Sequence, residues 1–112
     1  MAYEDDAKNV MLDELGTLIT YVGLLDDEDS EVSGGSPAYA RKAITWDAAA
    51  SGEMAASNQP EFDIPTGTTV AKVIFMSAIS GGTKYGEATI VEEIFNNQGI
   101  LILLTTTLDL NA

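Results

Sequence analysis

At 112 residues the chain has the size of one domain and can bury a hydrophobic core without disulfides or metals. It contains neither cysteine nor histidine, which removes thiolate metal ligands, disulfides and the usual general base, so we expect no enzyme activity, no cofactor and no metal. Its 18 acidic and 5 basic residues give a formal net charge of −13, which disfavours nucleic acids and membranes as partners and favours positively charged protein surfaces. The sequence shows no basic segment followed by an apolar one, as a signal peptide would have. No apolar run reaches the roughly 20 residues that a membrane-spanning helix needs, so we expect a soluble protein made in the cytoplasm.

The first predicted element is a short amphipathic helix over residues 3–15. Acidic residues at 4–6 suit a helix N-terminus, and Gly16 is expected to end the helix. We expect this helix either to pack on the sheet of its own domain or to dock as an arm on a neighbouring subunit. Its apolar stripe, at three- and four-residue spacing, consists of Ala7, Val10, Met11, Leu15 and Leu18.

An acidic loop follows the first predicted strand, which covers residues 17–25. Residues 26–31 form the densest acidic run of the chain, and clustered carboxylates can bind calcium. Because the EF-hand spacing and its turn glycine are missing, we favour a solvated loop and keep cation binding as an alternative. Residues 32–37 are rich in glycine and serine and predict a flexible surface excursion.

The second predicted strand, residues 39–48, contains the single tryptophan and the one adjacent basic pair of the chain. We expect Trp46 to anchor the core, with stacking on a ligand as the alternative. Arg41 and Lys42 are expected to pair with acidic residues of the chain's own loops or of a partner.

The middle of the chain predicts a weak strand at 53–57, a further strand at 61–64, a turn at Pro65–Gly67 and a long central strand at 69–78. Both faces of the central strand are apolar, with Val73 and Phe75 on one and Ile74 and Met76 on the other. It therefore needs cover on both sides, from a second sheet, the helix or another chain.

The C-terminal third predicts a strand at 84–91 interrupted by Gly86, with Ile94 and Phe95 returning to the core, and a turn at 96–99. A last strand covers residues 100–110. We expect Leu101 and Leu103 to point away from its main apolar face and to need a lid from the helix or a second subunit. That main face would consist of Ile100, Ile102, Leu104, Leu108 and Leu110.

About seven short strands between turn signals predict a mainly β fold, a single-domain antiparallel β-sandwich or barrel-like fold with a short N-terminal α-helix. The expected organisation is one domain over residues 1–112, with a helical arm at 1–16 and a β domain at 17–112.

Three ordered motifs, at residues 31–46 (EVSGGSPAYARKAITW), 62–70 (FDIPTGTTV) and 80–83 (SGGT), resemble a family of small phage virion proteins. Members are commonly labelled tail-fibre-like proteins in phages of actinobacteria and their relatives. The resemblance covers roughly residues 8–110. It implies a non-enzymatic, β-rich structural protein of the virion, although the acidic run at 26–31 and the insertion of Ala38 depart from the family pattern.

Because the chain has no fibrous repeat, we expect a capsid decoration or cement protein that stabilises the major capsid shell, located on the capsid exterior or the tail. A minor tail, tail-fibre or baseplate component is the alternative, and a carbohydrate- or cation-binding module is the second alternative. The expected partners are the major capsid protein or neighbouring virion subunits, with homo-oligomerisation. The candidate contact residues are Val10, Met11, Arg41, Lys42, Ile74, Met76, Leu101 and Leu103.

Overall fold

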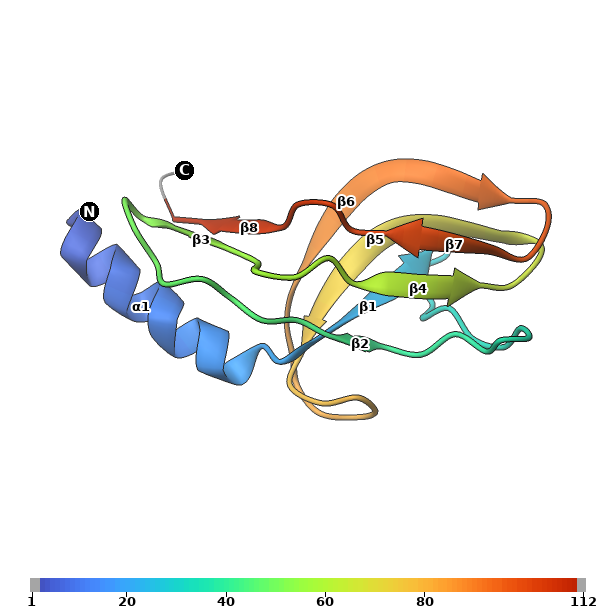
Figure 1. Cartoon of the computed structure of the whole chain (residues 1–112), viewed down its shortest axis with the longest axis horizontal. Coiled ribbons are helices and arrows are strands. Elements are labelled where there is room, and N and C mark those ends of the chain that lie inside the picture. The colour runs from blue at the N-terminus through green and yellow to red at the C-terminus, as the bar shows by residue number, and fades with distance from the viewer. Residues whose placement is uncertain (1–2, 111–112) are drawn as a thin grey trace.

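A computed structural model describes residues 3–110, in which one N-terminal helix precedes antiparallel β-sheets, as the sequence predicts (Figure 1). The predicted domain limits at residues 1–2 and 111–112 lie outside the described residues. The molecule is elongated, with extents of 46 × 23 × 21 Å. The elements in chain order are α1 (Asp5–Leu18), β1 (Tyr21–Asp26), β2 (Lys42–Ala43), β3 (Glu53–Ala55), β4 (Glu61–Ile64), β5 (Thr68–Met76), β6 (Lys84–Phe95), β7 (Gly99–Ile102) and β8 (Thr107–Asp109).

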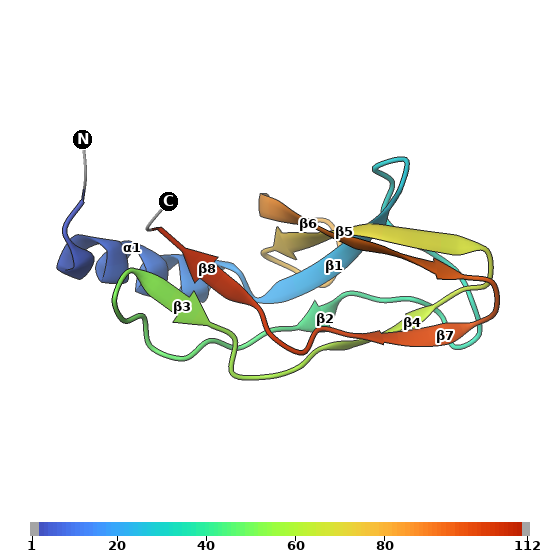
Figure 2. The ribbon, with the colours of Figure 1, turned by 90° about the horizontal axis from the view of Figure 1, so that it is seen from above.

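The β domain is a sandwich of two unequal layers. One layer is a four-stranded antiparallel sheet in the order β2-β1-β5-β6. The pair β4–β7 faces it, and the pair β3–β8 continues toward α1. Figure 2 shows β1, β5 and β6 in one layer and β4 and β7 in the other. The predicted sandwich is therefore confirmed.

The main core fills the space between the two layers. Its largest fully buried side chains from the sandwich strands include Phe62 and Ile64 on β4 and Leu24 on β1. Each such side chain stabilises the fold by about 1.5–3 kcal/mol relative to an exposed position. Strand β4 coincides with the strand predicted at 61–64, and β5 matches the central strand predicted at 69–78 except that it begins one residue earlier and ends at Met76.

A second, smaller cluster lies on the other face of the four-stranded sheet. Ile74 and Met76 are buried there with Leu25, and Tyr21 packs against them. Lys72 closes part of this face by pairing with Asp29 and Glu87 at 2.7 and 3.2 Å. The chain itself therefore covers both faces of β5, which corrects the expectation that Ile74 and Met76 are available to a partner.

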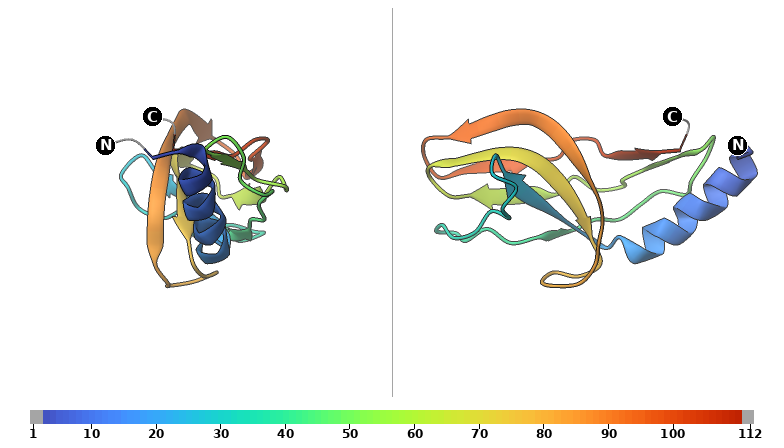
Figure 3. Two further views of the ribbon diagram at one scale, coloured as in Figure 1. Left: turned by 90° about the vertical axis from the view of Figure 1, so that its left-hand side faces the viewer. Right: turned by 180° about the vertical axis from the view of Figure 1, so that it is seen from behind.

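Helix α1 packs on its own domain, against β3 at one end of the molecule (Figure 3). It continues through Gly16 to Leu18, so the predicted end of the helix at Gly16 is wrong. A Cβ at Gly16 would lie 3.1 Å from the Met54 sulfur, so this glycine permits close approach to β3 instead of ending the helix. The first strand consequently begins at Tyr21 and not at residue 17.

The buried face of α1 differs from the predicted stripe. Leu12 is fully buried, whereas Val10 and Met11 are exposed. Half-buried Asn9 and exposed Asp13 accept backbone hydrogen bonds from Gly52 and Ala49 at 3.0 and 2.9 Å. These two polar side chains tie the helix to the chain by satisfying N–H groups of the 49–52 turn. Apolar spacing alone could not indicate this.

The strands predicted at 39–48 and 53–57 are shorter than expected. Regular pairing is confined to β2 and β3, and Trp46 joins Ala56 through an isolated bridge. Strand β6 is longer than expected, because it continues through Gly86 as far as Phe95. Phe95 packs against the core as predicted, but Ile94 is exposed, which corrects its expected burial.

The C-terminal run contains two strands with an irregular segment between them; over residues 100–104 its orientation is the reverse of the prediction, whereas Leu108 packs against the core as predicted. Leu101 is only 8% exposed and Leu103 packs against the core, whereas Ile100, Ile102 and Leu104 are exposed. The reason is the pairing of β7 with β4, which places Leu101 opposite the fully buried Phe62. A strand's partner fixes which face is buried, and a one-residue change of register inverts it.

Candidate interaction surface

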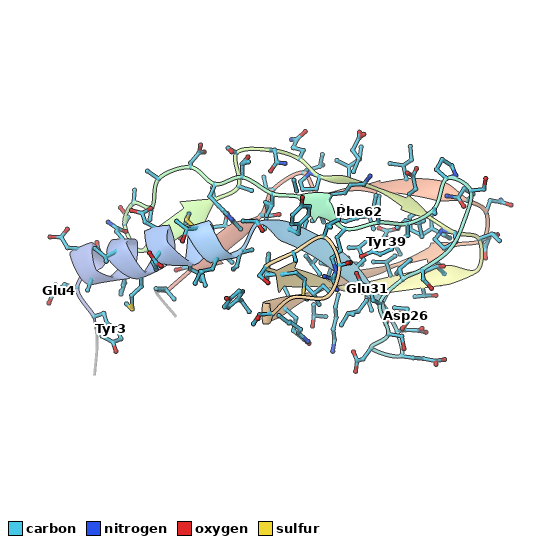
Figure 4. All side chains as sticks on the ribbon, turned by 90° about the horizontal axis from the view of Figure 1, so that it is seen from below. Tyr3, Glu4, Asp26, Glu31, Tyr39 and Phe62 are labelled. Carbon is cyan, nitrogen blue, oxygen red and sulfur yellow. The ribbon has the colours of Figure 1, made fainter. Side chains whose placement is uncertain are left out.

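A polar network closes the sandwich near the β1–β2 edge of the four-stranded sheet. The Glu31 carboxylate accepts hydrogen bonds from Arg41 Nε and Nη2, each at 2.9 Å, and from the Tyr39 hydroxyl at 2.9 Å (Figure 4). Arg41 Nη1 donates to the carbonyls of Ala78 and Gly81 at 3.0 and 2.8 Å. The Arg41 side chain is 10% exposed and the Glu31 side chain 31% exposed, so this bidentate pair is partly shielded from water. It joins residues 31–41 to the 78–81 loop.

Tyr39 connects this network to the core. Its hydroxyl accepts the Leu24 N–H at 2.9 Å, and its ring stacks on Phe62 with centroids 6.1 Å apart (Figure 4). A Cβ at Gly23 would lie 2.8 Å from the Tyr39 hydroxyl, so only glycine permits this approach. Hydrogen bonding to Arg41 lowers the pKa of Glu31, and burial raises the pKa of Tyr39. The network therefore holds Glu31 charged and Tyr39 neutral.

The network has the character of a structural clasp. Among residues 3–110, no buried side-chain nitrogen or oxygen lacks a hydrogen-bond partner. Each polar group of Glu31, Tyr39 and Arg41 is thus engaged within the chain. This confirms the expected pairing of Arg41 with the chain's own acidic loop, while its neighbour Lys42 lies half-buried on β2.

Most of the acidic loop is organised by internal contacts. Asp26 Oδ1 accepts the N–H groups of Glu28 and Ser30 at 2.9 and 3.0 Å, and Asp29 pairs with Lys72. Within the described range 3–110, no group of three or more acidic side chains is placed to hold a metal ion.

The 32–37 segment is held against the turn at 96–99 and is less free than the expected excursion. The Gln98 side chain accepts the Ser36 N–H at 3.4 Å and donates to the Pro37 carbonyl at 3.2 Å. Val32 is buried in the main core.

Trp46 anchors the core, as predicted. Its indole N–H donates to the Ile19 carbonyl at 3.0 Å, and its ring lies against Phe75 with centroids 6.5 Å apart. The indole N–H is engaged by the chain itself, but the ring is half-buried and lines an open pocket of about 410 Å³, so stacking on a ligand stays a prediction.

The opposite side of the sandwich is open. Strand β6 pairs with β5 along one edge, and its other edge has no partner strand in the part of the chain that the structure describes. Val91 and Ile94 on β6 are 85% and 68% exposed. A groove of about 560 Å³ runs between β6 and residues 101–105; its lining includes Ile90, Val91, Glu93, Ile102 and Leu104. We refer to β6, β7 and residues 103–105 as the open edge.

The candidate contact residues do not form one surface. Val10 and Met11 are exposed on α1, at the end of the molecule away from β7 (Figure 1). Ile74, Met76 and Leu101 are buried, and Leu103 packs against the core. The sequence analysis missed Val91, and it expected Ile94, Ile100, Ile102 and Leu104 to be buried. The mixture of isoleucine with Glu92 and Glu93 in β6 was the available signal for an exposed strand.

Comparison with known proteins finds no matching family model, no matching curated protein and no matching solved structure. No helix within residues 3–110 is long and apolar enough to cross a membrane. Function is therefore argued from the surfaces of the chain itself.

Proposed function

We propose that the chain is a non-enzymatic structural protein of a phage virion, and specifically a capsid decoration protein that binds the outside of the major capsid shell and stabilises it. The open edge carries this proposal. An apolar groove beside an unpaired strand is a typical protein-contact feature, since small monomeric proteins seldom leave such patches uncovered.

Charge and polar chemistry also support a binding role. The net charge of −13 is compatible with a position on the outer shell, away from packaged DNA. The Glu31–Tyr39–Arg41 clasp uses its polar groups in holding loops together, which favours an architectural function over catalysis.

Homo-oligomerisation remains part of the proposal, but through other residues. The predicted contacts Ile74, Met76 and Leu101 are buried and Leu103 packs against the core, so these side chains do not form the contact between copies. The exposed Val10 and Met11 on α1 instead offer an apolar contact between copies at the end opposite β7.

The main alternative is a minor tail, tail-fibre or baseplate component, because the motifs at 31–46, 62–70 and 80–83 resemble proteins with that label. The open edge would serve equally well there. A carbohydrate- or cation-binding module is less supported, because Trp46, Asp26, Asp29 and Glu31 all make contacts within the chain.

Cryo-electron microscopy of the phage that encodes the chain tests the location. We expect density of this size and shape at repeated positions on the capsid exterior. Density confined to the tail would overturn the decoration role and favour the alternative. As a second test, purified protein should bind capsids that lack it and raise the temperature at which those capsids disrupt.

A further inference from the structure

We propose that the open edge receives an extended segment of a partner protein as an added strand, and that this segment alternates basic with apolar side chains. The inference rests on the proposed function and deepens it, because it states what chemistry the capsid partner presents.

The first observation is the free edge of β6. The strand spans 12 residues and contains no proline, and its single basic residue, Lys84, stands at its start. Proteins usually protect long edges with lysine, proline or a covering segment, because unpaired N–H and C=O groups pair readily with another strand. Within the described residues, β5 pairs with one edge of β6, and no strand pairs with the other edge. Main-chain pairing along such an edge gives a partner affinity without requiring a deep pocket.

The second observation is the apolar groove beside that edge. On β6 the groove is lined by Val91, which is 85% exposed, and by Glu93, and on the facing layer by Ile102 and Leu104, which are 43% and 65% exposed. Alternate side chains of an added strand point to opposite faces, so one set would enter the groove. Apolar side chains suit that set.

The third observation is charge, which selects the partner. Glu87 is paired with Lys72 and Lys84, but Glu92 and Glu93 are exposed, and no ion pair within the described residues neutralises them. A second copy would bring one acidic β6 against another, between chains that each carry a net charge of −13. Like charges facing each other across strands destabilise the pairing. A basic segment from a different protein is therefore the occupant that fits.

A synthetic peptide of about ten residues that alternates lysine and valine is the probe. We expect it to shift the amide NMR signals of residues 84–95 and 99–105 and to slow hydrogen exchange in β6. A peptide of the same composition, with its lysines and valines in separate blocks, and a glutamate–valine peptide should each bind at least tenfold more weakly.

Substitutions in the chain locate the site. The double variant Val91→Lys/Ile94→Lys should weaken binding of the lysine–valine peptide roughly tenfold or more, because it removes the apolar Val91 from the groove and adds two like charges along β6. Leu18→Lys/Ile79→Lys makes the same charge change at exposed apolar residues away from the open edge and should bind as wild type does. Glu92→Lys/Glu93→Lys should also weaken binding, whereas Glu14→Lys/Glu28→Lys, with an equal net charge, should not. Melting curves of all variants check that each is folded.

Several outcomes would overturn the proposal: absence of peptide binding, equal binding of the block peptide, or signal changes confined to the acidic loop at 26–31. A dimer that dissociates in Val91→Lys/Ile94→Lys would instead assign the edge to a second copy. Capsid binding separates this inference from the proposed function. If wild type and Val91→Lys/Ile94→Lys bind capsids equally, the edge proposal fails and the decoration role stands. If wild type binds the peptide at β6 but does not bind capsids, the decoration role fails and the edge proposal stands.

Discussion

The two edges of the four-stranded sheet differ in how far the chain itself covers them. At the β1–β2 edge, Glu31, Tyr39 and Arg41 form a hydrogen-bonded clasp that reaches a loop 40 residues further along the chain. At the β6 edge, apolar side chains and unpaired backbone groups face solvent. The closed edge therefore serves the stability of the fold, and the open edge is available for binding. Substitutions at the two edges should have opposite profiles, with large effects on stability at the first and on binding at the second.

The largest loss of stability is expected from Phe62→Ala, between the layers. Phe62 is fully buried and stacks on Tyr39, so the substitution should reduce the free energy of unfolding by about 3–5 kcal/mol. Urea unfolding measures this loss. Ile100→Ala on the neighbouring strand β7 is the control and should change stability by less than about 1 kcal/mol, since Ile100 is exposed. Equal effects would mean that the layers are not packed as described.

Arg41→Met should give the next largest loss, about 2 kcal/mol, because Glu31 and two backbone carbonyls lose their donor. The adjacent substitution Lys42→Met removes the same charge and should change the free energy of unfolding by no more than about 0.5 kcal/mol. If both variants unfold at the same urea concentration, the clasp contributes nothing specific.

Acid should weaken the closed edge through Glu31. Hydrogen bonding to Arg41 lowers the folded pKa of Glu31 below its ordinary value of 4.5. Its contribution to stability is therefore fully present above that value and is lost as the pH falls through the folded pKa. We expect the stability difference between wild type and Glu31→Gln, measured by urea unfolding, to shrink as the pH falls below about 4.5. The subtraction cancels the titration of the other carboxylates, and a difference independent of pH would contradict the assignment.

The smallest stability effect is expected at the open edge. Val91→Lys/Ile94→Lys places two charges in the middle of a strand, yet should change the free energy of unfolding by no more than about 1 kcal/mol, because both side chains are exposed. Thermal and urea unfolding provide the measurement. A loss comparable with that of Phe62→Ala would show that these side chains support the fold and are not a binding surface.

Short-range sequence patterns predict much of this fold. The mainly β composition, the Pro65–Gly67 turn and the β4 and β5 strands follow from β-branched residues, apolar alternation and turn residues. Gly67 has a φ of 79°, which such a turn needs and glycine adopts without strain. These features depend on residues within a few positions of one another, so the sequence contains the necessary information.

Contacts between segments far apart in the sequence decided which faces of α1 and of the C-terminal run are buried. The inward face of α1 depends on the turn at 49–52, which Asn9 and Asp13 satisfy. The orientation of residues 100–104 depends on pairing with β4, which turned Leu101 inward and left Ile100, Ile102 and Leu104 exposed. Periodicity shows that a strand has two different faces, but it does not state which face meets the rest of the chain. The sequence by itself thus determined the class of fold, and the tertiary structure alone decided which edge is closed and which is open.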